Sequence, residues 1–180
     1  MAASAFVTSH YTSEHFVESS GAILFDLSQK TVKVCLIHYI KKNEWLLAKG
    51  RRNCHESRRD AALREVKEET GYQCRLYPVT MPTRAPVATS PCDIPDQARA
   101  YPDLTEPFML SIREIGKSNV KLIWWYIAEV EKNVQKAVGE TDFTSEFFDC
   151  DEALERLTFQ RDRDVLIKAV SIVNGSCKTD

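Results

Sequence analysis

The chain opens with two stretches rich in apolar, strand-favouring residues, separated by a polar triplet. The runs 16–25 and 31–40 flank the triplet 28–30, and this order predicts a β-hairpin. A third apolar run, 44–48, predicts a short strand. The polar and basic residues 49–57 that follow predict a loop.

Strong helix formers fill residues 57–70, and Gly71 is suited to end a helix because glycine tolerates a left-handed backbone. On that helix a group of apolar residues shares one face, which should lie against the core: Ala62, Leu63 and Val66. Residues 72–79 then predict a strand.

All seven prolines lie between residues 78 and 107, where they exclude regular helix and interior strand. We therefore expect a proline-rich loop at about 80–104, and a loop of that length is often functional. Beyond it the pattern predicts strands at 108–114, 121–130 and 146–149 and helices at 151–157 and 161–173. The second of these helices has core-facing apolar residues at helical spacing: Val165, Leu166, Ala169 and Val173. This order makes a mixed sheet with helices on its faces, in the α/β (α+β) class.

The length of 180 residues suits one compact domain. We expect a flexible N-terminal arm at 1–14 and a single domain over 15–175. A net charge of −2 argues against a nucleic-acid partner, and no apolar run is long enough for a membrane span. The six cysteines form no CxxC pair and the N-terminus lacks the apolar segment of a signal peptide, so we expect reduced thiols and a location in the cytoplasm or nucleus.

Three carboxylates share one face of the helix predicted at 57–70. With Glu65 at zero, Glu69 falls at about +40° and Glu68 at about −60° around the helix. Like charges this close repel one another, and a helix that only needed solvation would alternate its charges. A divalent cation among these carboxylates would relieve the repulsion, and oxygen donors at this density suit Mg²⁺ or Mn²⁺.

A basic segment precedes the acidic face, because residues 41–59 hold seven lysines or arginines against two acids. Cations that bind phosphates, next to carboxylates that hold a metal, are the groups that hydrolysis of a phosphoanhydride requires. We therefore expect a small polyphosphorylated substrate, bound by Lys41, Lys42, Lys49, Arg51, Arg52 and, from the proline-rich loop, Arg84. Charge alone also fits a solvated amphipathic helix after a basic turn.

The spacing of these residues resembles the Nudix box, G-x5-E-x7-R-E-U-x-E-E-x-G-U, in which U is apolar. The match includes every fixed position of the pattern: Gly50, Glu56, Arg64, Glu65, Val66, Glu68, Glu69, Gly71 and Tyr72. The resemblance implies the Nudix fold, an α/β/α sandwich around a mixed sheet, over roughly residues 16–173.

The resemblance also implies roles for individual residues. The metal ligands would be three carboxylates and one carbonyl, from Glu65, Glu68, Glu69 and Gly50. Arg64 would hold the glutamates in place, and the catalytic residues would be Glu65, Arg64 and Glu68, with Glu65 or a later glutamate as general base. Glu140 is our candidate for a further metal ligand from outside the box, with Glu146 as the alternative.

Two segments outside the box bear on the substrate. The run 45–50 (Trp-Leu-Leu-Ala-Lys-Gly) is similar to the W-x-x-P-K-G sequence of diadenosine-polyphosphate and diphosphoinositol-polyphosphate hydrolases, with Ala48 in place of proline. The stretch 157–163 resembles the C-terminal region of those enzymes. With the basic segment, this favours diphosphoinositol polyphosphates, then dinucleoside polyphosphates and then ADP-ribose, for which Pro86 lies near the marker position. A module that binds a phosphorylated ligand without cleaving it, and an RNA-directed enzyme, are alternatives from other classes.

Overall fold

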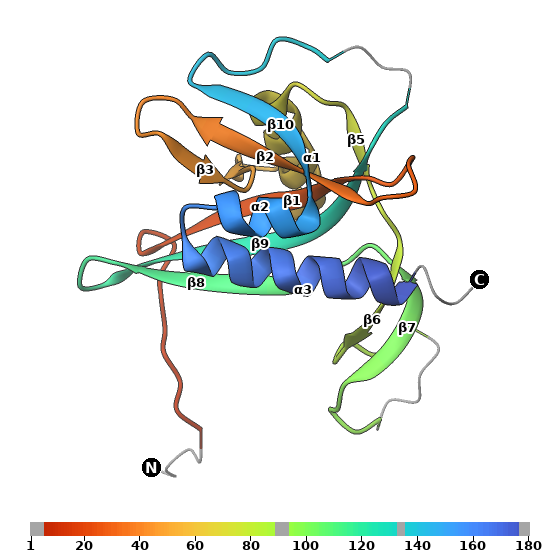
Figure 1. Cartoon of the computed structure of the whole chain (residues 1–180). Helices are drawn as coiled ribbons and strands as arrows, with labels where there is room; N and C mark the ends of the chain where they lie inside the picture. Colours follow the sequence, from red (N-terminus) through yellow and green to blue (C-terminus); the bar gives the residue numbers. More distant parts are fainter. Residues whose placement is uncertain (1–5, 89–93, 133–135, 177–180) are drawn as a thin grey trace, which may run out of the picture.

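The structure of this chain is a computed structural model, in which residues 6–88, 94–132 and 136–176 are described. The strands within these ranges are β1 (Phe16–Asp26), β2 (Lys33–Tyr39), β3 (Glu44–Leu46), β4 (Lys49–Arg51), β5 (Cys74–Leu76), β6 (Val79–Thr83), β7 (Arg99–Leu104), β8 (Met109–Ile115), β9 (Asn119–Val130) and β10 (Phe143–Asp149). Eight of them form a mixed sheet in the order β10-β2-β1-β9-β5, with β3 beside β2, β4 beside β1 and β8 beside β9 (Figure 1).

β1 and β9 run parallel along most of their length at the centre of the sheet. The hairpin predicted at 16–40 is confirmed, because the end of β1 pairs antiparallel with β2 at Phe25 and Val34. The first half of β1 pairs with β4 instead, which sets Gly50 opposite Ser20. The two halves of β1 therefore have different neighbours, and the half beside β4 supports the start of the box.

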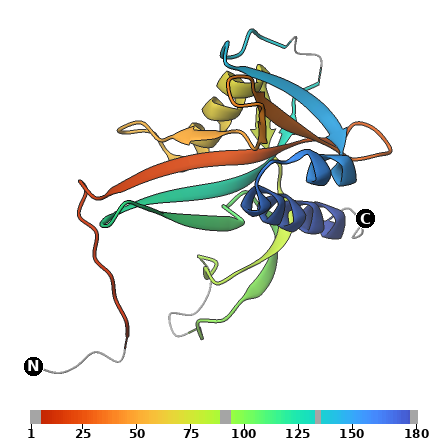
Figure 2. The same cartoon turned by 60° about the vertical axis from the view of Figure 1, so that its left-hand side comes forward.

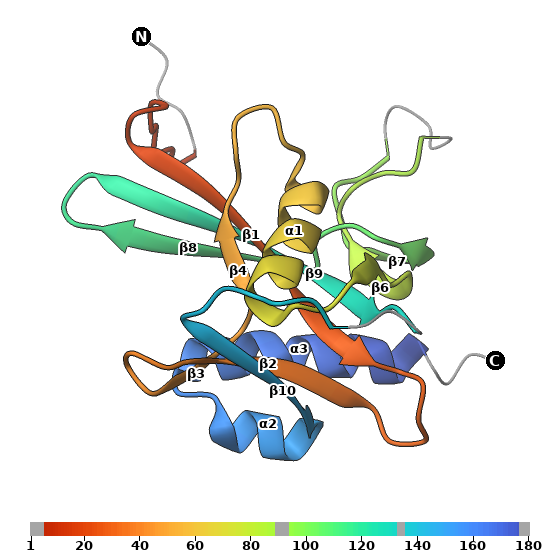
Figure 3. The same ribbon diagram turned by 90° about the horizontal axis from the view of Figure 1, so that it is seen from above.

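Helices cover both faces of the sheet. α1 (Arg58–Thr70) lies on one face, and α2 (Cys150–Arg156) and α3 (Gln160–Ser176) lie on the other (Figure 2, Figure 3). All three helices were predicted, and their arrangement confirms the α/β/α sandwich. α1 begins after Ser57 and ends at Gly71, whose φ of 77° is the left-handed conformation expected of a glycine cap.

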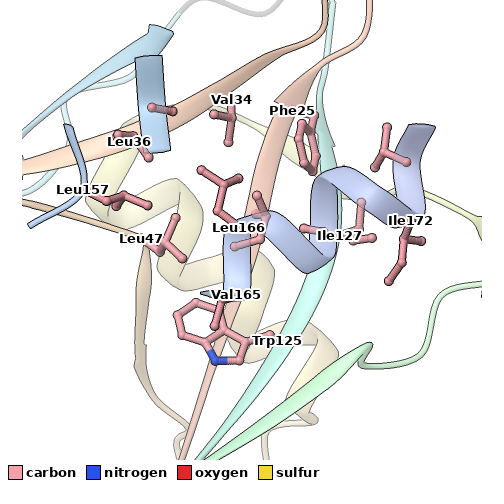
Figure 4. Close-up of a cluster of buried hydrophobic side chains, with 14 of the residues drawn as sticks. Phe25, Val34, Leu36, Leu47, Trp125, Ile127, Leu157, Val165, Leu166 and Ile172 are labelled. Atoms are coloured by element: carbon pink, nitrogen blue, oxygen red, sulfur yellow. The ribbon is translucent and has the colours of Figure 1, made fainter. Parts of the chain in front are cut away.

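Alternate residues of the central strands face the two helical layers. The cluster beneath α3 is built on large apolar side chains, among them Phe25, Leu36, Leu47, Trp125 and Leu166 (Figure 4). The cluster beneath α1 is richer in alanine and contains one large aromatic side chain, Tyr126, beside Ala22, Leu24, Ala62 and Val66. The apolar faces predicted for both helices are confirmed, since Val66 of α1 and Ala169 of α3 are completely buried.

The loop predicted at 49–57 is wrong for its first three residues, which form β4. β4 has no apolar alternation, and its strand conformation comes from pairing with β1. The partner strand lies far away in the sequence, so no local pattern reveals the pairing.

The loop predicted at 80–104 is also wrong at both ends, because β6 and β7 pair antiparallel as a two-stranded ribbon. Pro82 and Pro102 lie inside these strands. A ribbon of two strands has only edges, and an edge strand tolerates proline where its missing N–H would face away from the partner. Val79 and Met81 anchor the ribbon by packing into the cluster beneath α3.

No helix within the described ranges is long and apolar enough to cross a membrane. Four cysteines in those ranges are free thiols: Cys35, Cys54, Cys74 and Cys150. Cys92 and Cys177 lie outside the described residues.

Candidate active site

The box occupies β4, the turn that follows it and α1. The start of α1 is fixed by a reciprocal cap, because Ser57 Oγ accepts from the Asp60 N–H at 3.1 Å and donates to the Asp60 carboxylate at 2.6 Å. In the turn, the Asn53 N–H donates to the Glu56 carboxylate at 2.9 Å. These local bonds hold the turn compact and place the acidic face of α1 next to β4.

Arg64 connects the turn to the helix. Its guanidinium binds Glu56 through two bonds, of 2.7 and 3.0 Å. It also donates to Glu65 at 2.7 Å, to Glu68 at 2.8 Å and to the carbonyl of Arg51 at 2.9 Å. A guanidinium offers five N–H donors in a rigid plane, so one side chain fixes three carboxylates and β4 together.

Glu65 and Glu69 lie buried against β4. A Cβ added to Gly50 would overlap the Glu65 carboxylate, so only glycine leaves room for it there. The Glu69 carboxylate accepts from the Lys49 N–H at 2.8 Å. Burial raises the pKa of Glu69 to about 8, opposed by Lys49 and reinforced by the charges of Glu65 and Glu140. The two carboxylates thus lie in a desolvated region, where the negative charge of one disfavours ionisation of the other.

Burial is also the main cause of the raised pKa of Glu65, and the charges of Glu68 and Glu140 add to it, while Arg64 opposes it. Glu140 belongs to the segment beside the end of α1, where its N–H donates to the Glu68 carbonyl at 2.8 Å. Glu146, the alternative to Glu140, alternates along β10 with Ser145, whose hydroxyl bonds the carbonyl of Thr70 on α1. Glu146 therefore faces away from α1.

The donor set fits a hard divalent cation in part. Two carboxylates, those of Glu65 and Glu69, contact β4 at Gly50 and Lys49. Carboxylates that repel each other in a desolvated site suit Mg²⁺ or Mn²⁺. Among the described residues, however, no group of three or more His, Cys, Asp or Glu side chains converges closely enough to hold a metal ion. Two of the predicted ligands do not join the others: Arg64 binds the Glu68 carboxylate at 2.8 Å, and Glu140 is exposed to solvent. These two side chains would have to turn to join the set.

The cations predicted to bind substrate divide into two groups. Three of them form ion pairs with carboxylates: Lys41 with Asp142 at 2.6 Å, Arg52 with Glu18 at 3.0 Å and Arg84 with Asp96 at 2.8 Å. Arg84 follows β6, in which the Thr80 N–H donates to Ser176, the last residue of α3. The cavity described in the next paragraph lies at the other end of α3, roughly 20 Å away. Lys42, Lys49 and Arg51 remain close to the box.

A cavity of about 460 Å³ opens between β8, β9 and the start of α3, and the sequence analysis did not predict it. It is lined by Ser111, Ile112, Arg113, Glu114, Trp125, Arg161, Asp162 and Val165. Arg113, Arg161 and Asp162 also line an adjoining hollow of about 270 Å³ that reaches Lys42 and Lys49. The cavity therefore leads directly to β4.

Cations gather around this cavity. Burial lowers the pKa of Lys121, and the charges of Lys49, Arg113 and Arg51 lower it further. Lysines and arginines this close repel one another, and a bound anion would offset the repulsion. The sequence does not reveal this group of cations, because β4, β8 and β9 each contribute to it from a different part of the chain.

Glu18 is a second residue that the sequence analysis missed. It is nearly buried on β1 and accepts from Arg52 at 3.0 Å, from Arg58 at 2.6 Å and from the Trp124 indole at 3.1 Å. The bonds from Arg58 and Trp124 lower its pKa in spite of its burial. The signal for it in the sequence was an acid inside a predicted strand. Glu18 joins the central sheet to the turn of the box.

Known proteins resemble this chain in sequence over part of its length. An 8-oxo-(d)GTP phosphatase of Mycolicibacterium smegmatis is 37% identical over 83 residues, which cover 39% of this chain and 26% of that protein. An m7GpppN-mRNA hydrolase of Caenorhabditis elegans is 39% identical over 61 residues, covering 34% of this chain and 8% of that protein. The chain thus matches about a quarter or less of the length of these relatives.

Solved structures resemble the whole fold. A C. elegans Ap4A hydrolase in a binary complex has a TM-score of 0.58 at 14% identity, covering 88% of this chain and 98% of that one. A NUDIX hydrolase from Nitrosomonas europaea has a TM-score of 0.56 at 15% identity, covering 89% and 90%. The model of the NUDIX domain family matches residues 16–169, which is most of the chain. With the complete box in place, this chain belongs to the Nudix family.

Proposed function

We propose that this chain hydrolyses a phosphoanhydride bond in a small polyphosphorylated substrate with the help of Mg²⁺ or Mn²⁺. The proposal rests on one observation. The Glu65 carboxylate lies against Gly50 and that of Glu69 accepts from the Lys49 N–H, while the Lys49 side chain lines the hollow that adjoins the cationic cavity. Metal-binding oxygens and phosphate-binding cations are therefore only one residue apart.

The divalent ion, when bound, would neutralise phosphate charge and lower the pKa of a coordinated water. Glu65, Glu69 and the Gly50 carbonyl would hold it, joined by Glu68 and Glu140 once their side chains turn. Arg64 fixes the Glu65 carboxylate through a bond of 2.7 Å and so limits its movement during the reaction. Glu65 or Glu68 would accept the proton of the attacking water, and Lys49 and Arg51 would bind phosphate oxygens.

The substrate that we propose carries a short phosphate chain. A diphosphoinositol polyphosphate presents many phosphates around a ring, and three of the six cations predicted to bind them are held by carboxylates instead. A dinucleoside polyphosphate needs fewer cations, and the names of the relatives include an Ap4A hydrolase and an 8-oxo-(d)GTP phosphatase. We therefore place dinucleoside polyphosphates before diphosphoinositol polyphosphates and ADP-ribose. The free thiols fit our proposed location in the cytoplasm.

The proposal is tested by phosphate release with Mg²⁺ and with Mn²⁺. The substrates are Ap4A, a diphosphoinositol polyphosphate, ADP-ribose and capped RNA. The control variants are Glu69→Gln, which keeps the side-chain shape, and Glu155→Gln, which changes an exposed glutamate of α2. We expect metal-dependent turnover that Glu69→Gln lowers at least about a hundredfold and Glu155→Gln leaves unchanged. If no substrate is turned over and the wild type matches Glu69→Gln, the chain is a binding module and the proposal fails. If substrate is turned over equally fast by Glu69→Gln, the assignment of Glu69 to the metal site is wrong.

A further inference from the structure

Most of the large apolar side chains that are exposed within the described ranges gather at one end of the molecule. They belong to residues 6–16 and to β8, where Leu110, Ile112 and Ile115 all reach solvent and Ile112 is 63% exposed. Single exposed apolar residues are common on protein surfaces, but a group of them in one place usually marks a binding surface. This end of the molecule is therefore a candidate contact for another protein chain.

β8 is an edge strand. In the described part of the chain it pairs with β9 alone, and Figure 3 shows it at the margin of the sheet. An edge strand offers N–H and C=O groups to a further strand, so proteins usually protect it with proline, a bulge or charges. β8 contains no proline, and its register with β9 is continuous over all seven residues. Of its two charged residues, Arg113 pairs with Asp162, which leaves Glu114 to discourage pairing.

Leu110 and Ile112 point to the face of this edge that carries α1. The residues that alternate with them contact the opposite side, because Met109 packs into the cluster beneath α3 and Ser111 accepts from the Trp125 indole at 3.0 Å. The hairpin of β8 and β9 extends beyond α1 (Figure 3), and there Ile112 borders an open hollow of about 290 Å³ with residues of β1 and β9. The edge thus combines an unprotected backbone with an uncovered apolar face.

We propose that two copies of this chain associate through the outer edges of β8, which pair antiparallel around a two-fold axis at Ser111 and continue the sheet from one copy into the other. This register sets Leu110 of each copy opposite Ile112 of the partner subunit, so both apolar side chains lose contact with water. It also brings the exposed Glu106, which precedes β8, within one residue of the exposed Lys117 of the partner subunit, which follows that strand. Opposite charges therefore meet at both ends of the paired segment.

The segment 106–117 is its own complement, which favours a second copy over an unrelated strand. Reversing the segment matches its acid to its base and its apolar residues to one another, as a closed two-fold contact requires. A parallel copy in the same register would instead set Glu106 beside a second Glu106. The dimer is independent of the proposed function, because β8 contains none of the groups that we assign to hydrolysis.

Sedimentation velocity measures the association directly. The full chain is compared over about a hundredfold range of concentration, because mass action populates a dimer as the concentration rises. We expect the mass to rise from the 20.5 kDa of one chain towards twice that value. Leu110→Lys should raise the dissociation constant at least about tenfold, because an ammonium group would face apolar Ile112 beside the axis. The matched control is Ile167→Lys, which changes a similarly exposed apolar residue of α3 and should leave the constant unchanged.

Charge reversal tests the direction of the pairing. Glu106→Lys and Lys117→Glu should each raise the dissociation constant about threefold, because each sets like charges together at both ends of the segment. The double variant restores opposite charges and should return the constant to that of the wild type. Both residues are exposed, so these variants serve if Leu110→Lys does not fold.

Three results overturn the inference. A mass of one chain at every concentration means that no dimer forms and that the edge is open to another protein. A dimer that Leu110→Lys leaves intact uses a different surface. A double variant that associates as weakly as the single variants rules out the antiparallel register.

Discussion

β4 divides two regions of opposite charge that differ in how they are built. On the α1 side, Gly50 leaves space for Glu65 and Glu69, and these acids come from one helix that directly follows the strand. On the α3 side, Lys49 reaches a cavity whose other charged groups, such as Arg113, come from distant strands and from α3. The carboxylates of the box are thus held by local contacts, whereas the charged groups that line the cavity are brought together by tertiary packing.

The two regions should therefore respond differently to substitution. Arg64 restrains the acidic side through bonds to Glu56, Glu65 and Glu68, so a small displacement of Arg64 should affect these three carboxylates together. Among the described residues of the cationic side, no single residue binds several of the charged groups in this way. We therefore expect large losses of turnover from the first region and smaller losses of affinity from the second.

The largest effect is expected for Gly50→Ala. The new Cβ would overlap the Glu65 carboxylate and displace it from β4. We expect turnover to fall on the order of a thousandfold while the circular dichroism spectrum stays that of the wild type. The control is Gly175→Ala on α3, where an added Cβ meets nothing within 4 Å. Wild-type turnover in Gly50→Ala would mean that Glu65 acts without its contact to β4.

A smaller effect is expected for Lys49→Ala. Its side chain borders the hollow that joins the box to the cavity, so its loss should raise KM about tenfold and change kcat little. Lys41→Ala is the comparison, because the sequence predicted the same role for both lysines and the structure pairs Lys41 with Asp142. Equal increases of KM in the two variants would show that the basic segment acts as a diffuse charge, which removes the distinction between the two sides of β4.

The sequence predicted the helix and the shared face of its glutamates but not the cavity, because the first depends on residues close together in the chain and the second on residues far apart. The cap residue Ser57, the glycine at 71 and the spacing of the glutamates all lie within one helix, where a period of about 3.6 residues relates position to face. Arg113 and Asp162 meet only because β8 pairs with β9 and α3 packs across both. Neither residue is part of a local pattern, and β4 was missed for the same reason.

The smallest effect concerns stability and pH. Burial raises the pKa of Asp162 in the folded protein above its ordinary value of 3.8. The folded state therefore holds the proton to higher pH than the unfolded state, so this group lowers stability as pH rises from about 4 through the folded pKa. Asp162→Asn removes that titration. We expect its Tm to equal that of the wild type near pH 3 and to exceed it by a few degrees at pH 7.

This result would bear on the difference between the two regions. A carboxylate that lowers stability at neutral pH is better explained by ligand binding than by folding, since functional sites often contain groups that destabilise the fold. A lower Tm at pH 7 would instead show that the pair of Arg113 and Asp162 stabilises the contact between β8 and α3, and Asp162 would then belong to the packing of the fold.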